Sequence, residues 1–303
     1  MGKYIHITEK KVRGSGLYVV DEVSRGKYLL VDSIHAFSEI MKGTGEGDSL
    51  IFHGRACVIS AMPFLAYNRI AGRNRVGYQP HTRLRPIKWN RLVLNSFFDA
   101  VFCLTEHNRQ ELAAYGVKNA IVVPNPIPVG RIAPHVVKNP KKEYDAVWAG
   151  RDAPCKRVAM FINAAKKEGS AKALVLAPRL LDGNRPCLDG AKNVRLVEGL
   201  DGKGFFSALQ SAKAFFFTSD ENEGFPISLL EAAYLRLPIV ASDYPKYREL
   251  LGDYAIYWRS EEDLARLIGQ AAGKNGIEVD EVELEKVLSR FSPEEIIRKY
   301  ESW

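Results

Sequence analysis

The stretch AKAFFFTSDENEGFPISLLEAAYLRLPIVASD, residues 212–243, decides the fold of this chain. It opens with a short apolar run, passes through a polar loop, and carries apolar residues at helical spacing before a second apolar run. This order predicts a strand, a loop, a helix and a strand. Pro226 suits the first turn of that helix, because its missing N–H costs no hydrogen bond there.

The same alternation of apolar runs and helix-like stretches continues through the whole sequence. Short, nearly continuous apolar strands between helices are typical of parallel sheets that are covered on both faces. We therefore predict two doubly wound α/β domains with a cleft between them. The runs expected to form strands are Lys3–Thr8, Tyr28–Ile34, Ser49–Gly54, Arg75–Gln79, Ala100–Thr105, Ala120–Pro124, Asp145–Gly150, Ala173–Pro178, Val194–Gly199, Ala214–Ser219, Pro238–Asp243 and Ala255–Trp258.

One segment, PNPIPVGRIAPHVVKNPKKEYD (124–145), interrupts this series with prolines and a basic run. Polar, proline-rich segments of this kind are typical of domain linkers. We expect a first domain at 1–125, a linker at 126–143, and a second domain from residue 144 onward. In doubly wound sheets ligands bind outside the carboxyl ends of the strands, so the loops after the strands are expected to carry the chemistry.

Charge is distributed unevenly between the two halves. The 303 residues carry a net charge of +7, yet residues 1–140 hold 19 lysines and arginines against 10 acidic residues, and the rest hold 24 against 26. No acidic residue lies between Asp48 and Asp99. This asymmetry indicates an anionic partner for the first domain, namely a membrane surface, a phosphorylated substrate or nucleic acid, with a merely solvated basic face as the alternative. The basic patch comprises Arg69, Arg73, Arg75, Arg83, Arg85, Lys88 and Arg91.

Composition excludes several classes of protein. No apolar run approaches the roughly 20 residues of a membrane span, and the N-terminus MGKYIHIT lacks the apolar region of a signal peptide. We therefore expect a cytoplasmic protein. The four cysteines have no CxxC spacing and no Asp-x-Asp occurs, so no metal site is expected.

Two glutamates frame the helix of the opening stretch. Glu231 lies beside the apolar stripe of Ile227, Leu230 and Tyr234, where a carboxylate is costly unless it has a hydrogen-bonding partner. Glu223 precedes the helix, whose N-terminus at Gly224–Ile227 offers free N–H groups to an anion. One element would thus supply an anion site and two carboxylates that accept from hydroxyls. The alternative is a partly exposed helix glutamate and a first-turn acid favoured by the helix dipole.

The segment from Glu223-Gly224-Phe225-Pro226 to Leu230-Glu231 resembles the E-x7-E signature of the retaining glycosyltransferases of family 4, glycosyl transferases group 1, which have the GT-B fold. Three further stretches agree in order. DAVWAGRDAPCKR (145–157) resembles the first strand of the nucleotide domain, and FCLTEHNRQELAAYGVKNAIVVPNPIP (102–128) resembles the end of the acceptor domain. FSPEEIIRKYESW (291–303) resembles the closing helix that crosses back onto the first domain, which would end the second domain at residue 290.

The resemblance implies a role for each matching residue. Arg151 and Lys156 match paired basic residues that contact the donor diphosphate, and their position after a strand suits charge-assisted bonds to a leaving group. Glu231 matches the residue that holds the nucleotide ribose, and Glu223 the one that contacts donor-sugar hydroxyls. Gly224, Phe225, Pro226 and Ile227 would border the donor.

The first domain, shorter than the family norm, matches less of the family pattern. Gly14 and Gly16 in EKKVRGSG (9–16) occupy the place of the family's glycine-rich loop, although a plain turn explains them equally well. Two histidines follow strand ends. His81 holds the position equivalent to the family's catalytic-cleft histidine, whereas His53 is expected to be structural.

Together these features predict a retaining, metal-independent glycosyltransferase that uses a UDP- or GDP-linked sugar and no cofactor. The acceptor would be a lipid-linked or cell-surface glycan, with the enzyme peripheral on the inner face of a membrane. Leu92, Val93, Leu94, Phe97 and Phe98 would then reach the membrane, although burial against the sheet is the favoured alternative for these residues. Two other functions stay open: transfer to a modified base in DNA, and a non-catalytic nucleotide-sugar-binding subunit.

Overall fold

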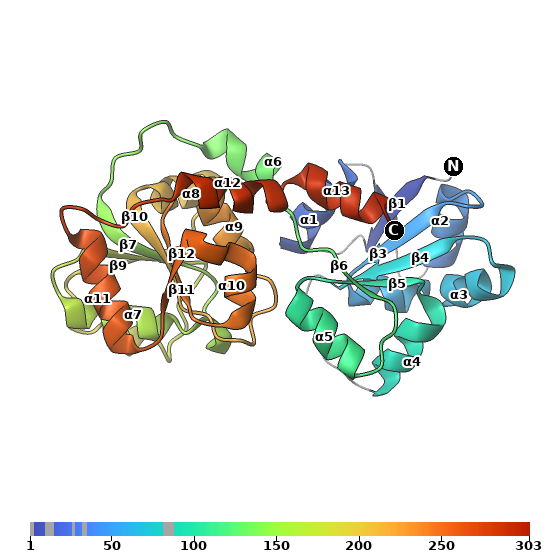
Figure 1. Ribbon diagram of the computed structural model, residues 1–303, viewed down its shortest axis with the longest axis horizontal. Coiled ribbons are helices and arrows are strands. Elements are labelled where there is room, and N and C mark those ends of the chain that lie inside the picture. The colour runs from blue at the N-terminus through green and yellow to red at the C-terminus, as the bar shows by residue number, and fades with distance from the viewer. Residues whose placement is uncertain (1–2, 10–14, 26–27, 32–34, 81–87) are drawn as a thin grey trace. The chain divides into compact units, whose positions relative to one another are not determined.

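The computed structural model describes residues 3–9, 15–25, 28–31, 35–80 and 88–303 (Figure 1). By contacts the chain divides into a first unit, residues 1–128 with 291–303, and a second unit, residues 129–290. Gly14, His81, Arg83 and Arg85 lie outside the described residues.

The first unit contains one parallel six-stranded sheet in the order β2-β1-β3-β4-β5-β6. Its helices are α1 (Ser15–Ser24), α2 (Ala36–Gly43), α3 (Arg55–Ala71), α4 (Lys88–Phe97), α5 (Glu106–Ala114) and α13 (Pro293–Glu301). Its strands are β1 (Tyr4–Glu9), β2 (Tyr28–Val31), β3 (Ser49–His53), β4 (Arg75–Gln79), β5 (Ala100–Cys103) and β6 (Ala120–Val122).

The second unit also contains one parallel six-stranded sheet, in the order β12-β11-β10-β7-β8-β9. Its strands are β7 (Tyr144–Ala149), β8 (Ala173–Ala177), β9 (Val194–Glu198), β10 (Ala212–Phe217), β11 (Ile239–Ser242) and β12 (Ala255–Trp258). Its helices are α6 (Val129–Ile132), α7 (Val158–Glu168), α8 (Gly202–Gln210), α9 (Ile227–Tyr234), α10 (Pro245–Leu251), α11 (Glu261–Ala272) and α12 (Glu281–Arg290). The predicted α/β fold of two doubly wound parallel sheets is confirmed.

Alternating side chains of the first sheet feed two separate apolar cores. Leu50 and Phe52 of β3 face one core, whereas Ile51, between them, faces the other. This alternation is what a pleated strand requires when helices cover both faces. Leu94 of α4 and Phe98, which follows this helix, are buried in the first of these cores, so the favoured alternative of burial against the sheet is confirmed for them, whereas Leu92 is 61% exposed.

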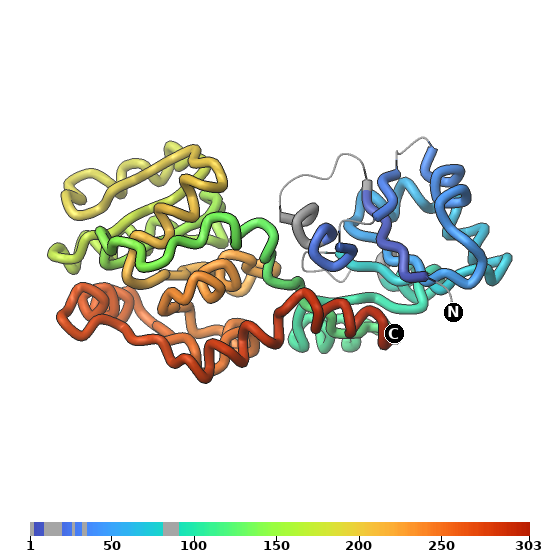
Figure 2. Tube along the Cα trace, turned by 90° about the horizontal axis from the view of Figure 1, so that it is seen from above, coloured from blue at the N-terminus to red at the C-terminus, as the bar shows by residue number. Residues whose placement is uncertain are grey.

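The C-terminal segment completes the second of these cores. Helix α13 begins after Ser292, whose hydroxyl accepts from the N–H of Glu295, and it lies beside α1 (Figures 1 and 2). Its Tyr300 ring stands edge-on to Phe102, with 5.0 Å between centroids. Gly77 of β4 makes room here, because a Cβ at this position would lie 2.5 Å from the Phe102 ring.

Candidate donor-binding site

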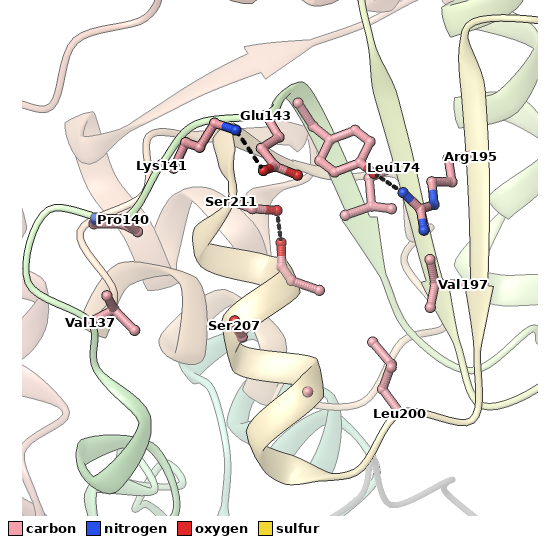
Figure 3. Close-up of a pocket in the computed structure, with 13 residues that line it drawn as sticks. Val137, Pro140, Lys141, Glu143, Leu174, Arg195, Val197, Leu200, Ser207 and Ser211 are labelled. Atoms are coloured by element: carbon pink, nitrogen blue, oxygen red, sulfur yellow. Dashed lines mark hydrogen bonds and ion pairs between the residues drawn. The ribbon is translucent and has the colours of Figure 1, made fainter.

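The second unit has a cavity of about 440 Å³ where residues 137–144, α8 and the strands β8 and β9 meet (Figure 3). Its charged groups pair with one another or with a hydroxyl. Lys141 lies 3.2 Å from Glu143, and Arg195 donates to the hydroxyl of Tyr144 at 2.9 Å. None of the residues that line it was predicted as a site residue. The predicted site residues Lys156 and Glu223 lie instead in loops that follow the carboxyl ends of β7 and β10.

Topology brings two loops together at that edge. The chain moves outward from β7 through β8 to β9, and then returns to place β10 on the other side of β7. Strand order therefore reverses between β7 and β10, which is where doubly wound sheets bind ligands. The loop after β7 holds Arg151 and Lys156, and the loop after β10 holds Glu223.

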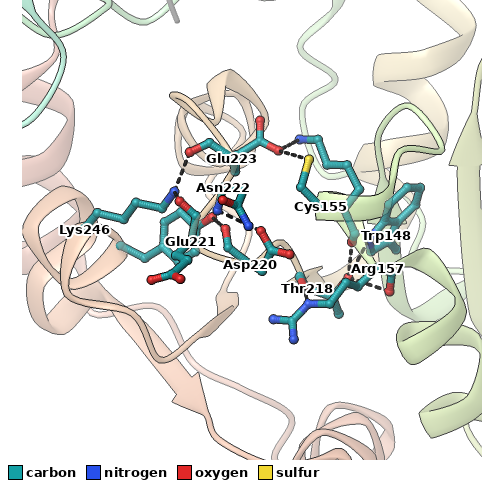
Figure 4. A network of polar contacts seen from close by, with 11 residues as sticks. Trp148, Cys155, Arg157, Thr218, Asp220, Glu221, Asn222, Glu223 and Lys246 are labelled. Carbon is teal, nitrogen blue, oxygen red and sulfur yellow. Dashed lines mark hydrogen bonds and ion pairs between the residues drawn. The ribbon is translucent and has the colours of Figure 1, made fainter. Parts of the chain in front are cut away.

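Lys156 and Glu223 form an ion pair of 3.0 Å between these two loops, and each side chain is at least 86% buried. The Cys155 thiol lies 3.8 Å from the same carboxylate oxygen of Glu223 (Figure 4). Burial, and then the charge of Glu223, raises the pKa of Cys155, so this thiol stays protonated. The N–H of Asp220 donates to the carbonyl of Cys155 at 2.8 Å, which ties the loops at a second point.

Thr218, at the end of β10, fixes the backbone of the Lys156 loop. Its hydroxyl donates to the carbonyl of Lys156 at 2.8 Å and accepts from the indole N–H of Trp148 at 2.9 Å. Arg157 adopts a left-handed conformation, with φ of 49°, and donates to the carbonyl of Thr218 at 2.9 Å. The position of the Lys156 side chain thus depends on a buried hydrogen-bonded network.

The Glu223 loop is held from its other side by α10. Lys246 is 6% exposed, and its ammonium donates to the carbonyls of Glu221, at 2.6 Å, and Glu223 (Figure 4). The hydroxyl of Tyr247 donates to the carbonyl of Asp220 at 2.6 Å. Sequence reasoning missed Lys246, because a single lysine in a short helix carries no pattern that separates it from a surface cation.

Glu231 has the partner that its buried position requires. It is 3% exposed on α9, and its carboxylate accepts a hydrogen bond from Arg131 of α6. The alternative of a partly exposed helix glutamate is therefore excluded. Burial raises the pKa of Glu231, while the charges of Arg131 and Lys156 oppose that rise. Sequence reasoning missed Arg131, which lies in the predicted linker a hundred residues away.

Helix α9 begins one residue later than predicted. Pro226 precedes its first turn with a ψ of 88°, outside the helical range, so the helix starts at Ile227. Two hydroxyls near this start are buried without a hydrogen-bond partner among the described residues. They belong to Ser219, at the end of β10, and Ser228, in the first turn of α9. A buried hydroxyl in this state is costly unless a ligand satisfies it.

The remaining predicted residues are dispersed. Arg151 is exposed, and no ion pair links it to a described residue. Gly16 lies within α1, and Lys88 is the first residue of α4. His53 is buried against His6, with 2.7 Å between ring nitrogens.

The described residues of the basic patch lie on several elements. Arg73 donates to the carbonyl of Thr44, and Arg75, at the amino end of β4, lies over the Trp303 ring. Arg69, on α3, and Arg91, on α4, are exposed. The amino end of β4 is the sheet edge opposite to the one where ligands of such sheets bind.

Comparisons with known proteins concern the fold and part of the second unit. Residues 187–274 match the family model of Glycosyl transferases group 1. This range contains Glu223 and the helix α9 with Glu231, and it leaves Arg131, Arg151 and Lys156 outside. A search of curated proteins found no match to the sequence.

Solved structures resemble the whole chain at low sequence identity. The Anabaena protein Alr3699/HepE, in complex with UDP and glucose, superposes with a TM-score of 0.74 at 13% identity, covering 100% of this chain and 99% of that chain. A glycosyltransferase from Rickettsia africae has a TM-score of 0.75 at 13% identity, over 99% and 97%. The lipopolysaccharide outer core galactosyltransferase WaaB has a TM-score of 0.67 at 16% identity, over 99% and 98%. Such similarity shows the fold, which is that of the GT-B glycosyltransferases.

The family match and the shared fold together support a nucleotide-sugar-dependent glycosyltransferase. Among the described residues, no helix has the length and apolar character needed to cross a bilayer.

Proposed function

We propose that this chain is a retaining, metal-independent glycosyltransferase of family 4, which moves a sugar from a nucleotide-diphosphate sugar to a hydroxyl of its acceptor. One observation carries the proposal. Lys156 and Glu223 form a largely buried ion pair of 3.0 Å at the point where the second sheet reverses its strand order. Buried charges of this kind are costly and cluster at functional sites.

The donor would be held by groups of both loops. Lys156 would bond the diphosphate, with Arg151 reaching it from the exposed loop and the first N–H groups of α9 adding their dipole. Glu223, released from Lys156, would accept hydrogen bonds from the sugar hydroxyls. Glu231 would accept from the ribose, and the hydrogen bond from Arg131 favours the charged form of its carboxylate against the effect of burial. The buried hydroxyls of Ser219 and Ser228, which have no hydrogen-bond partner among the described residues, would bind the donor as two further groups.

The reaction would proceed at one face of the sugar. The bond between the anomeric carbon and the phosphate oxygen breaks, and the acceptor oxygen bonds to that carbon from the same side. The proton of the acceptor hydroxyl passes to the departing phosphate. Lys156 would stabilise the charge that develops on the diphosphate, and the loss of one such donor typically costs about 10²–10³ in kcat.

For the donor we propose a UDP-sugar, because the Anabaena structure of the same fold holds UDP and glucose. For the acceptor we propose a lipid-linked or cell-surface glycan. The basic first unit and the similarity to a lipopolysaccharide galactosyltransferase support this acceptor class.

The test is turnover of a panel of UDP- and GDP-sugars, measured as release of the nucleotide by purified protein. We expect Glu223→Gln and Lys156→Ala to lower turnover by at least about a hundredfold while the circular dichroism spectrum is unchanged. Lys167→Ala is the matched control, because Lys167 forms a 3.0 Å pair with Glu262 at an exposed site. Near-normal turnover of both site variants would contradict the proposal.

A further inference from the structure

Helix α3 of the first unit exposes an apolar face. Ile70 is 90% exposed and Ile59 is 61% exposed, and Pro63 and Ala66 between them are exposed as well. At 100° per residue these four positions follow one line along the helix. The opposite side, which includes Phe64 and Leu65, is buried in the core. Apolar side chains therefore occupy the outer side of α3 as well as its buried side, and a contiguous group of exposed apolar side chains marks an interaction surface.

Two aromatic residues widen this face. Tyr67 of α3 and Phe37 of α2 are each about two-fifths exposed, and their rings meet edge-to-face with 5.8 Å between centroids. A tyrosine that is apolar over its ring and polar at its hydroxyl suits a boundary between water and an apolar phase. We call Phe37, Ile59, Pro63, Ala66, Tyr67 and Ile70 the α3 face.

Cations border the α3 face. Arg55 and Arg69 are exposed on α3 itself, and Lys42 is exposed on α2. The acidic side chain of α2, Glu39, is half-buried, and α3 has no acidic residue. The sequence contains none between Asp48 and Asp99. The surface therefore combines apolar groups that can leave water with positive charges at their margin.

The exposed apolar side chains and the cations beside them distinguish between three possible partners of the α3 face: a second copy of this chain, a nucleic acid and an anionic bilayer. In a twofold dimer the α3 face would oppose its own copy, and Arg55 and Arg69 would meet identical cations without acidic partners. A nucleic acid would satisfy the arginines and leave two isoleucines in water. An anionic bilayer satisfies both kinds of group, because apolar side chains enter the headgroup region and arginines bind the lipid phosphates.

We propose that the α3 face docks this protein on an anionic lipid bilayer. The inference deepens the proposed function, since a lipid-linked acceptor is presented at a membrane surface. Vesicle binding is measured without a donor sugar. A failure to bind vesicles would therefore contradict the docking proposal alone, and a failure of sugar transfer would contradict the proposed function.

Co-sedimentation of the full chain with vesicles tests the proposal. We expect binding to phosphatidylcholine vesicles that contain phosphatidylglycerol, weak binding to phosphatidylcholine alone, and a decrease with rising salt. Ile70→Asn should lower the partition coefficient at least about tenfold, because burying one such side chain is worth about 1.5–3 kcal/mol. Arg69→Gln should lower it about fivefold, since one basic residue contributes about 1 kcal/mol at an anionic surface.

Val282→Asn is the matched control, because Val282 is an apolar side chain that is 66% exposed on α12 of the second unit. It should bind vesicles as the wild type does, and both Ile70→Asn and Val282→Asn should release nucleotide at the wild-type rate. Three results would overturn the proposal: no binding to anionic vesicles, equal binding of Ile70→Asn and wild type, or a dimer in light scattering that Ile70→Asn dissociates.

Discussion

Replacing Arg131 by methionine should destabilise the second unit by about 4 kcal/mol at neutral pH. The change removes the partner of a carboxylate on a residue that is only 3% exposed, and breaking such a pair costs about 3–5 kcal/mol. The Arg131 side chain is 29% exposed, so we expect the lower end of this range. Arg131 also lies over the ring of Phe206 at 5.2 Å, which adds about 0.5–1 kcal/mol.

The pH dependence of this loss has a defined sign. Burial raises the pKa of Glu231 above its ordinary value of 4.5, so the folded chain keeps this proton to a higher pH than the unfolded chain. Stability contributed by Glu231 therefore falls as the pH rises from 4.5 toward the folded pKa. Removing Arg131 raises the folded pKa further. The difference between Arg131→Met and the wild type should thus be small near pH 4.5 and grow toward neutral pH.

Urea unfolding of the full chain, followed by circular dichroism at several pH values, measures this difference. Adding Glu231→Gln to Arg131→Met removes the uncompensated charge, and the double variant should recover all but about 1 kcal/mol, the part that belongs to the contact with Phe206. A double variant as unstable as Arg131→Met, or a loss that does not change with pH, would refute a charge-compensating role for Arg131.

Three further predictions concern other parts of the chain. Lys246→Met should lower kcat/KM for the donor about tenfold to hundredfold in nucleotide-release assays, because the Glu223 loop loses the ammonium that binds two of its carbonyls. Gly77→Ala should cost about 1–3 kcal/mol in urea unfolding, since its Cβ would lie 2.5 Å from the Phe102 ring, whereas Gly183→Ala, with no atom within 4 Å, should be neutral. Hydrogen bonds from Arg248 and Arg259 lower the pKa of Asp243 to about 2, so its contribution to stability is lost as the pH falls from 3.8 through 2. Because these arginines are exposed, Asp243→Asn should cost less than about 1 kcal/mol at pH 7, and this cost should shrink in urea unfolding as the pH is lowered from 3.8 toward 2.

The fold was predictable because its signal is local. Every predicted strand overlaps a strand of the structure, and the boundaries of Arg75–Gln79 and Ala255–Trp258 agree at both ends. The run at 214–219 differs most visibly, since β10 starts two residues earlier, where Ala212 pairs with Tyr144 of β7. That pairing depends on a strand far away in sequence, which no local pattern reports.

The site was predictable only where one loop carries its own motif. Glu223 and Glu231 stand at the two ends of a recognisable segment, and of the two interpretations that the sequence left open for Glu231 the structure supports the buried one. Arg131, which binds Glu231, and Lys246, which binds the carbonyl of Glu223, lie far from these residues in the sequence and come close to them only in the folded chain. The α3 face was missed for a different reason. Apolar residues lie on both the inner and the outer side of α3, and only the structure shows which of them have no neighbour.

The ion pair of Lys156 and Glu223 has a consequence for how the proposed donor would bind. Lys156 is held by Glu223 in this structure, and a diphosphate that takes Lys156 leaves a carboxylate that is largely buried. A buried carboxylate without a partner is costly in free energy until other groups donate hydrogen bonds to it, and the sugar hydroxyls can do so. Binding of the diphosphate and binding of the sugar are then coupled. The diphosphate displaces Glu223 from Lys156, and the sugar hydroxyls donate hydrogen bonds to the carboxylate that is released. A nucleotide diphosphate without its sugar would displace Glu223 from Lys156 but supply no hydroxyls to its carboxylate. The site should therefore bind the intact nucleotide sugar more tightly than the nucleotide diphosphate that remains after transfer.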